Sequence, residues 1–216
     1  MSSAPGYTLA LESSTYAGSV AVIRGDEIFA SIDVEMRGRD EERLMPAVAG
    51  CVSRVPEGMG AIQRVVCGAG PGSFTSLRIA ASIAKGICHA RGIPLFAVSS
   101  LSLIVAAAGK ERGSYVVALD AMRGESFAAL VNVADDGTIP PAVPVRIVPS
   151  PALAGEAAKA GAEWLSGAPH ASGVARMLDS IIAGGPVDLG AWEPDYGRAA
   201  EAQVKWEAAH GRPLPR

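Results

Sequence analysis

The pattern of apolar and polar residues in the first hundred positions predicts strands first and alternating strands and helices afterwards. Short apolar runs predict strands at residues 7–11, 19–23, 28–34, 64–67 and 95–98. Periodic apolar stripes predict helices at residues 40–55, 73–91 and 101–108. The Gly-Asp turn at 24–27 makes the second and third strands a hairpin. The first helix begins at Asp40 or, because of Pro46, near Met45.

The opening pattern returns half a chain later, which favours two related lobes. Ala-Leu-Glu at 10–12 and Ala-Leu-Asp at 118–120 each precede a turn and an apolar strand. The stretch 134–151 contains five prolines and is expected to be mostly loop. Further helices are expected at residues 152–160, 174–182 and 199–210. We therefore expect an α/β protein with a first lobe at 1–100, on which helix 199–210 can pack, and a smaller second lobe at 101–198.

Composition and charge narrow the classes of function. The chain has 216 residues, 49% hydrophobic and 19% charged, with a net charge of -3. It has no Lys/Arg cluster, so tight independent binding to nucleic acid is not expected. No apolar run reaches the length of about 18 residues that a membrane span needs, and residues 1–6 do not resemble a secretory signal. A cytoplasmic location is therefore expected. The three cysteines lie in apolar stretches and are expected to be small buried hydrophobes.

A glycine-rich turn before the second helix is the sharpest local feature. The sequence Gly-Ala-Gly-Pro-Gly-Ser-Phe-Thr at 68–75 follows a predicted strand and opens a predicted helix. Ser73 or Thr75 can cap the helix, whose first N–H groups also favour anions. The spacing fits neither a Walker A loop nor a dinucleotide fingerprint. The pattern leaves a capped turn and a phosphate or partner site as alternatives.

The helix after this turn has an unusually wide apolar surface. Its polar residues Arg78, Ser82, Lys85 and His89 have spacings of four, three and four, which place them on one narrow stripe. The remaining surface is more apolar than one lobe would cover. The helix is therefore either central to the fold or faces another chain. In the second case, Ala80, Ala81 and Ala84 would allow close approach of a partner helix.

Candidates for catalysis are few. None of the three histidines lies within four residues of another, so no histidine-pair motif for a metal is present. The G-x-S-x-G motif of a serine nucleophile is absent. Glu12 and Asp120 end the matched strands, and both could face a cleft between the lobes, where magnesium or general-base chemistry would suit them. The alternative is that they accept hydrogen bonds from backbone N–H groups of the turns.

Taken together, these motifs resemble the TsaB family. The resemblance rests on the stretches at residues 9–15, 70–79, 84–86, 92–95, 98–101 and 118–125, in this order and spacing. It is specific over about residues 8–133, and Pro194, Tyr196 and Arg198 resemble the family's end. The resemblance implies a two-lobed actin-like fold, of the Hsp70-like and sugar-kinase-like kind, with a degenerate second lobe.

The resemblance also implies a function. A TsaB protein is a non-catalytic partner of the catalytic subunit TsaD. With the ATPase TsaE, they place threonylcarbamoyl on N6 of the adenosine after the anticodon in tRNAs that read codons beginning with A. It implies a homodimer when the chain is alone, only indirect contact with tRNA, no required cofactor and no protease site, although such proteins are called glycoprotease-like. ATP or ADP at an interface of the complex stays an open alternative.

Two sets of residues follow from this combination of motif and resemblance. The expected partner surface comprises Gly72, Ser73, Phe74, Thr75, Leu77, Arg78, Ala81, Ser82 and Lys85. Candidates for nucleotide contact are Glu12, Ser14, Thr15, Gly70, Asp120 and Arg123.

The chain departs from the family pattern at three positions. Glu12 replaces the usual Asp, which weakens the case for bound nucleotide; Ser76 replaces Gly, which could crowd an interface; and Asp40 replaces His. An actin-like ATPase, a small-molecule kinase and a stand-alone nucleotide-binding dimer remain the alternative functions.

Overall fold

A computed structural model describes residues 6–36, 42–198, 206 and 209–212. The predicted helix start at Asp40 lies outside the described residues, and so does most of the predicted helix 199–210. Within the described residues, no helix is long and apolar enough to cross a membrane.

The first sheet contains five strands in the order β3-β2-β1-β4-β5. The strands are β1 (Tyr7–Glu12), β2 (Ala17–Arg24), β3 (Glu27–Glu35), β4 (Ile62–Gly68) and β5 (Leu95–Val98). The first three form the predicted antiparallel meander, while β4 and β5 run parallel to β1 and are each reached by way of a helix. All five lie within a few residues of their predicted positions.

The second sheet repeats the arrangement of the first with one strand fewer. Its strands are β6 (Gly113–Asp120), β7 (Glu125–Val133), β8 (Arg146–Pro149) and β9 (Glu163–Leu165), in the order β8-β7-β6-β9. Strand β6 pairs antiparallel with β7 and parallel with β9, as β1 does with β2 and β4. The internal repeat and the two-lobed actin-like α/β fold are thereby confirmed, and the missing counterpart of β5 makes the second lobe the degenerate one.

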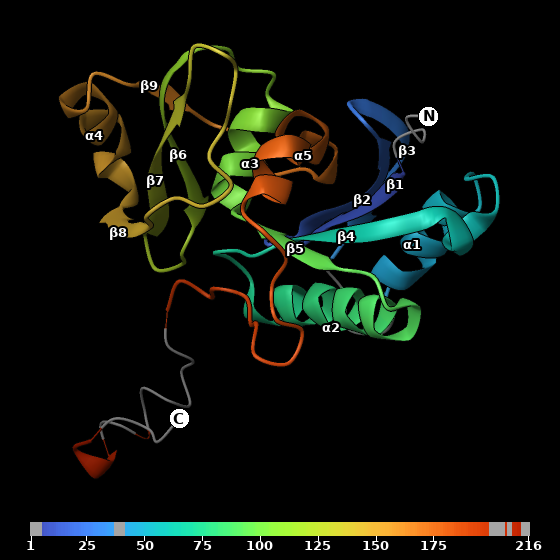
Figure 1. Ribbon diagram of the computed structural model, residues 1–216. Helices are drawn as coiled ribbons and strands as arrows, with labels where there is room; N and C mark the ends of the chain where they lie inside the picture. The colour runs from blue at the N-terminus through green and yellow to red at the C-terminus, as the bar shows by residue number, and fades with distance from the viewer. Residues whose placement is uncertain (1–5, 37–41, 199–205, 207–208, 213–216) are drawn as a thin grey trace.

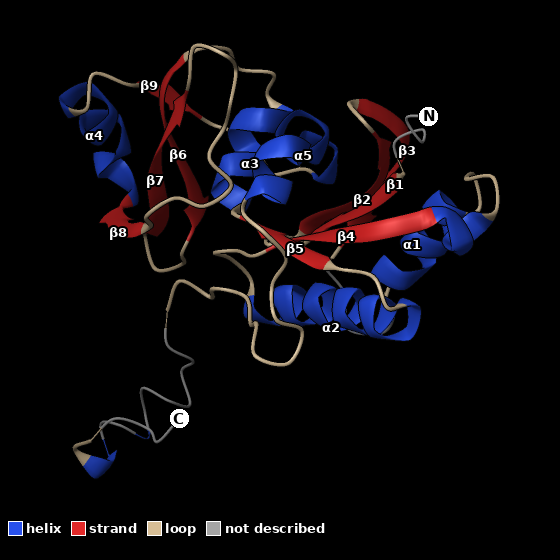
Figure 2. Ribbon diagram, viewed as in Figure 1, coloured by secondary structure: helices blue, strands red, loops and turns tan. Residues whose placement is uncertain are grey.

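The helices form layers around and between the two sheets (Figures 1 and 2). Helices α1 (Leu44–Val52) and α2 (Phe74–Arg91) cover one face of the first sheet. Helices α3 (Ser100–Ala107) and α5 (Val174–Ala183) lie between the sheets, and α4 (Leu153–Lys159) covers the outer face of the second sheet. Three short 3-10 helices, η1 (Gly58–Ala61), η2 (Ser150–Ala152) and η3 (Ala171–Gly173), complete the described elements. The boundary near residue 100 stays a prediction.

Two large apolar clusters hold these layers together, and a smaller third one joins α4 to the second sheet. One lies between the first sheet and α1 and α2, and the other surrounds α3 and α5 and takes side chains from both sheets. Residues 100–106 of α3 are all buried, which suits a helix enclosed on every side. Cys51, Cys67 and Cys88 are free thiols in the interior, as expected.

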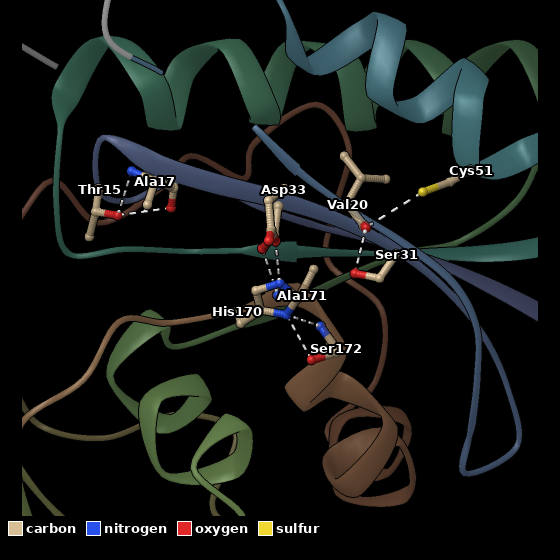
Figure 3. Close-up of polar contacts among 10 residues, drawn as sticks. Thr15, Ala17, Val20, Ser31, Asp33, Cys51, His170, Ala171 and Ser172 are labelled. Atoms are coloured by element: carbon tan, nitrogen blue, oxygen red, sulfur yellow. Dashed lines mark hydrogen bonds and ion pairs between the residues drawn. The ribbon is translucent and has the colours of Figure 1, made fainter. Parts of the chain in front are cut away.

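A polar cluster fixes the late segment η3 on the first sheet (Figure 3). The ring of His170 lies between Asp33 of β3 and Ser172, with Nε2 at 2.8 Å from the Asp33 carboxylate. The backbone N–H of Ser172 donates to Nδ1 at 3.1 Å, so Nε2 carries the proton and donates to Asp33. The backbone N–H of Ala171 donates to the Ser19 hydroxyl on β2. A segment far along the chain is thus tied to the opening hairpin.

Candidate functional site

The glycine-rich turn between β4 and α2 is packed against the loop after β1. Gly70 has a left-handed backbone with a φ of 89°, and a Cβ there would overlap the carbonyl oxygen of Asp195. A Cβ at Gly72 would overlap the backbone of Ser14, whose carbonyl accepts a 2.7 Å bond from the Ser73 N–H. Glycine is therefore required because two other segments approach the turn closely.

Glu12 lies beneath this turn and is completely buried. Its carboxylate accepts a 2.6 Å bond from the Ser14 N–H and a 2.8 Å bond from the Ser100 hydroxyl. The same hydroxyl accepts a 3.2 Å bond from the Gly70 N–H. Because Ser100 begins α3, one carboxylate joins the end of β1, the glycine turn and the central helix.

The environment of Glu12 favours its protonated form. Burial raises the pKa of Glu12 above its ordinary value of 4.5, while the bonds from Ser14 and Ser100 act in the opposite direction. The space beside the carboxylate is filled, because a Cβ at Gly68 would overlap one carboxylate oxygen.

Asp120 occupies the matching position in the second lobe but a different environment. Its carboxylate accepts a 2.8 Å bond from the Met122 N–H two residues on, as Glu12 does from Ser14, yet Asp120 is exposed. Both carboxylates therefore accept from turn backbone, which is the second of the two roles left open by the sequence. Met122 and Arg123 both have left-handed backbones, with φ values of 67° and 59°.

The remaining nucleotide candidates serve the chain's own turns. The hydroxyl of Thr15 bonds with the backbone of Ala17, as Figure 3 shows. Ser14 is buried. Its backbone N–H donates to the Glu12 carboxylate, and its carbonyl accepts the N–H of Ser73. In the part of the chain that the structure describes, no group of three or more His, Cys, Asp or Glu side chains is arranged to hold a metal ion.

The outer side of α2 carries most of the expected partner surface. Phe74 is 38% exposed, and Thr75, Arg78 and Ser82 are exposed beside it. Gly72, Ser73 and Lys85 are half-buried. An open groove of about 420 Å³ runs along this side, lined by Glu42, Phe74, Thr75, Arg78, Ile79, Ser82 and Ile83.

Part of the expected surface lies inside the chain instead. Leu77 and Ala81 are buried, as are Ala80 and Ala84, because this side of α2 packs on the first sheet. The prediction that these small residues admit a partner helix is wrong. Ser76 also faces inward, with its hydroxyl 3.0 Å from that of Ser73, so it does not crowd the outer side.

The predicted cap of α2 is also absent. Ser73 is the N-cap residue, but its side chain makes no capping hydrogen bond. Its hydroxyl bonds with Ser76 instead. The fold thus orients the start of α2 through the backbone of Ser14 rather than through a side-chain cap.

Residues 192–198, called the C-terminal strap below, cross from α2 to the second sheet. The Asp195 N–H donates to the Ala69 carbonyl at 2.7 Å. The ring of Tyr196 packs on Phe74 with centroids 4.6 Å apart. Arg198 forms an ion pair with Glu125 at the start of β7. Tyr196 and Arg198 are indicated in the sequence only by the family resemblance, because an irregular segment has no periodic pattern.

Known proteins resemble the chain in sequence and in fold. A family model described as TsaD, tRNA N6-adenosine threonylcarbamoyltransferase, matches residues 38–144. The tRNA threonylcarbamoyladenosine biosynthesis protein TsaB of Bacillus subtilis is 30% identical over 122 residues, which cover 56% of this chain and 53% of that protein. TsaB of Escherichia coli is 30% identical over 121 residues, covering 55% and 52%. The chain thus spans about half the length of the curated TsaB relatives it matches.

Two further relatives match over a larger share of their length. An uncharacterized protein of Mycobacterium tuberculosis is 34% identical over 153 residues, which cover 68% of this chain and 69% of that protein. The structure titled YeaZ from Pseudomonas aeruginosa superposes with a TM-score of 0.72 at 23% identity, covering 88% of this chain and 99% of that one. Because its sequence identity is only 23%, the match to the YeaZ structure concerns the fold alone.

Gly68→Ala is expected to lower the free energy of unfolding by about 1–3 kcal/mol, because the added methyl group overlaps the buried Glu12 carboxylate. Gly86→Ala is the matched control. Gly86 lies within α2 with open space around it, so alanine there should raise stability by about 0.5–1 kcal/mol. Urea denaturation measures both, and equal effects of the two substitutions would contradict the close packing around Glu12.

Glu12→Gln is expected to remove part of the pH dependence of stability. The raised pKa means that the folded state holds the Glu12 proton more tightly than the unfolded state. The free energy of unfolding of the wild type should therefore fall as pH rises from 4.5 through the raised folded value. The variant should gain stability relative to the wild type over that range. Urea titrations at a series of pH values measure the difference, and parallel curves would count against this assignment.

Proposed function

The chain belongs to the TsaB family, and on that premise we propose that it is a non-catalytic subunit in the biosynthesis of threonylcarbamoyladenosine in tRNA. It pairs through the exposed side of α2 with a TsaD-related catalytic subunit, and a TsaE-related ATPase joins them. The catalytic subunit transfers threonylcarbamoyl to N6 of the adenosine after the anticodon. The single observation that carries this proposal is the exposed groove along α2.

The composition of the groove favours a protein partner. Phe74, Ile79 and Ile83 provide apolar area, and Thr75 and Ser82 provide hydrogen-bonding groups around it. Phe74 is a large, exposed apolar side chain in the first turn of α2. Other apolar residues of this helix pack on the first sheet. An apolar centre with polar groups beside it is typical of protein interfaces.

A TsaD-related chain is a suitable partner because it is homologous over this region. The match to the TsaD model covers residues 38–144, which contain α1 and α2. A homologous subunit presents a helix layer of the same kind, and two such layers can meet face to face about an approximate two-fold axis. The same geometry permits pairing of two copies of this chain when the partner is absent.

The packing around Glu12 supports a non-catalytic role. An actin-like ATPase, a kinase or a nucleotide-binding dimer would use the carboxylate at the end of β1 in an open cleft. Here that carboxylate is enclosed and bonded to Ser14 and Ser100. The turn above it is occupied by the chain's own strap, since Asp195 bonds with Ala69 and lies against Gly70.

Arg78→Glu is expected to weaken binding to the TsaD-related subunit of the same organism about 10-fold or more, with little change in melting temperature, because Arg78 is exposed in the groove. Calorimetry and size exclusion measure association, and thermal unfolding measures stability. Arg112→Glu is the control, since Arg112 is exposed beside the second sheet and pairs only with the exposed Asp135 among the described residues. An absence of any complex with the wild-type chain would refute the proposed pairing.

Depletion of this protein is expected to lower the threonylcarbamoyladenosine content of tRNAs that read codons beginning with A. Nucleoside analysis of purified tRNA measures the loss. Expression of the wild type or of Arg112→Glu should restore the modification, and expression of Arg78→Glu should restore it less. Unchanged modification after depletion would contradict the proposed function, and ATP hydrolysis by the pure chain would favour the ATPase alternative.

A further inference from the structure

We propose that Arg78, held in place by Tyr196 of the C-terminal strap, is a positioned cation that meets a carboxylate on the TsaD-related partner. This inference rests on the proposed pairing through α2. It adds the chemistry of the contact and a positioning residue that lies 118 positions away in the chain.

The guanidinium of Arg78 is held by two aromatic side chains. Its central carbon lies 4.1 Å from the centroid of the Phe74 ring and 5.5 Å from that of Tyr196. Its Nε–H donates to the Tyr196 hydroxyl at 3.2 Å. The two rings also pack on each other, which limits the freedom of both. An arginine restrained in this way loses less conformational entropy when a partner binds.

The remaining donors of Arg78 are available for a partner. The bond to Tyr196 uses Nε, and the terminal amino groups have no acceptor among the described residues. Glu42 lines the same groove, but it makes no ion pair with Arg78, and its carboxylate accepts from the backbone N–H groups of Leu44 and Met45. The two terminal nitrogens of Arg78 can therefore donate two parallel hydrogen bonds to one carboxylate.

Burial of the groove favours an anion from the partner, because the carboxylate of Glu42 in the same groove is bonded to backbone N–H groups of α1. Phe74, Ile79 and Ile83 surround Arg78 with apolar surface, so a partner that covers the groove removes water from the cation. An unpaired buried charge is strongly unfavourable, and a bidentate carboxylate removes that penalty. Pairing of two copies of this chain supplies an anion less well, because the outer stripe of α2 carries the cations Arg78 and Lys85 and would bring like charges together. The observations favour a different chain with an acidic residue at this point.

The strap fixes Tyr196 from both ends. The Asp195 N–H bonds with Ala69 beside the glycine turn, and Arg198 forms an ion pair with Glu125 on the second sheet. Gly197 has a left-handed backbone with a φ of 70°, and a Cβ there would overlap the Phe127 ring. The orientation of Arg78 on the first lobe therefore depends on contacts that reach the second lobe.

Three variants and calorimetry with the TsaD-related subunit test this inference, at about 0.05 M and about 0.3 M salt. Wild-type affinity should fall as salt rises. Arg78→Met should bind about 10-fold more weakly or worse at low salt and lose most of the salt dependence. Arg78→Lys keeps the charge but should recover only part of the affinity, because an ammonium lacks the planar fork. Tyr196→Phe keeps the ring packing but loses the bond to Arg78, and should bind about 3- to 10-fold more weakly.

Melting temperatures distinguish positioning from folding. Tyr196→Phe should melt within a few degrees of the wild type while its affinity falls. Arg112→Met, the control, should match the wild type in affinity and salt dependence. If the wild type binds but Arg78→Met binds equally well, the charge contact is overturned while the pairing stands. Equal affinity of Tyr196→Phe and wild type would overturn the positioning role, whereas failure of the wild type to bind would overturn the proposed function itself.

Discussion

A buried carboxylate bonded to a serine hydroxyl organises the interior of this protein. The bond from Ser100 to Glu12 joins the first strand of the first sheet to the helix that lies between the two sheets. The same hydroxyl receives the N–H of Gly70, so the turn that launches α2 is positioned by the same group. Burial of an acidic group is unfavourable unless its oxygens are bonded or protonated, and here both the bonds and the raised pKa of Glu12 contribute. These bonds fix the glycine turn, and the turn in turn fixes which side of α2 faces away from the first sheet.

Both lobes have a carboxylate at the end of a strand that accepts a hydrogen bond from the following turn, but the two carboxylates lie in different environments. Glu12 and Asp120 each end the central strand of a sheet and each accept the N–H two residues further on. In the first lobe, the helix α3 and the glycine turn close over the carboxylate, whereas the second lobe leaves it exposed. The repeat therefore contains one enclosed carboxylate that supports packing and one exposed carboxylate that accepts a hydrogen bond within its own turn.

Much of the fold could be predicted from local pattern, while the surface could not. The pattern predicts the strand, glycine turn and helix around α2 to within two residues, because alternation and helical periodicity report directly on local structure. Periodicity also shows which residues share a face, but not which face meets the sheet. For that reason the sequence leaves the core and a partner as alternatives for Ala80 and Ala84, and the structure places both in the core. Strand β9 is only three residues long, and β8 lies in a proline-rich stretch, so neither has a clear signal. The contacts of Tyr196 depend on tertiary structure alone.

The position of the strap in the chain has a consequence for how the molecule matures during synthesis. All residues of α2 and of the sheet beneath it lie within the first hundred positions. Tyr196 emerges only about a hundred residues later. A nascent chain therefore exposes the aromatic side chain of Phe74 until the residue that packs on it has been synthesised.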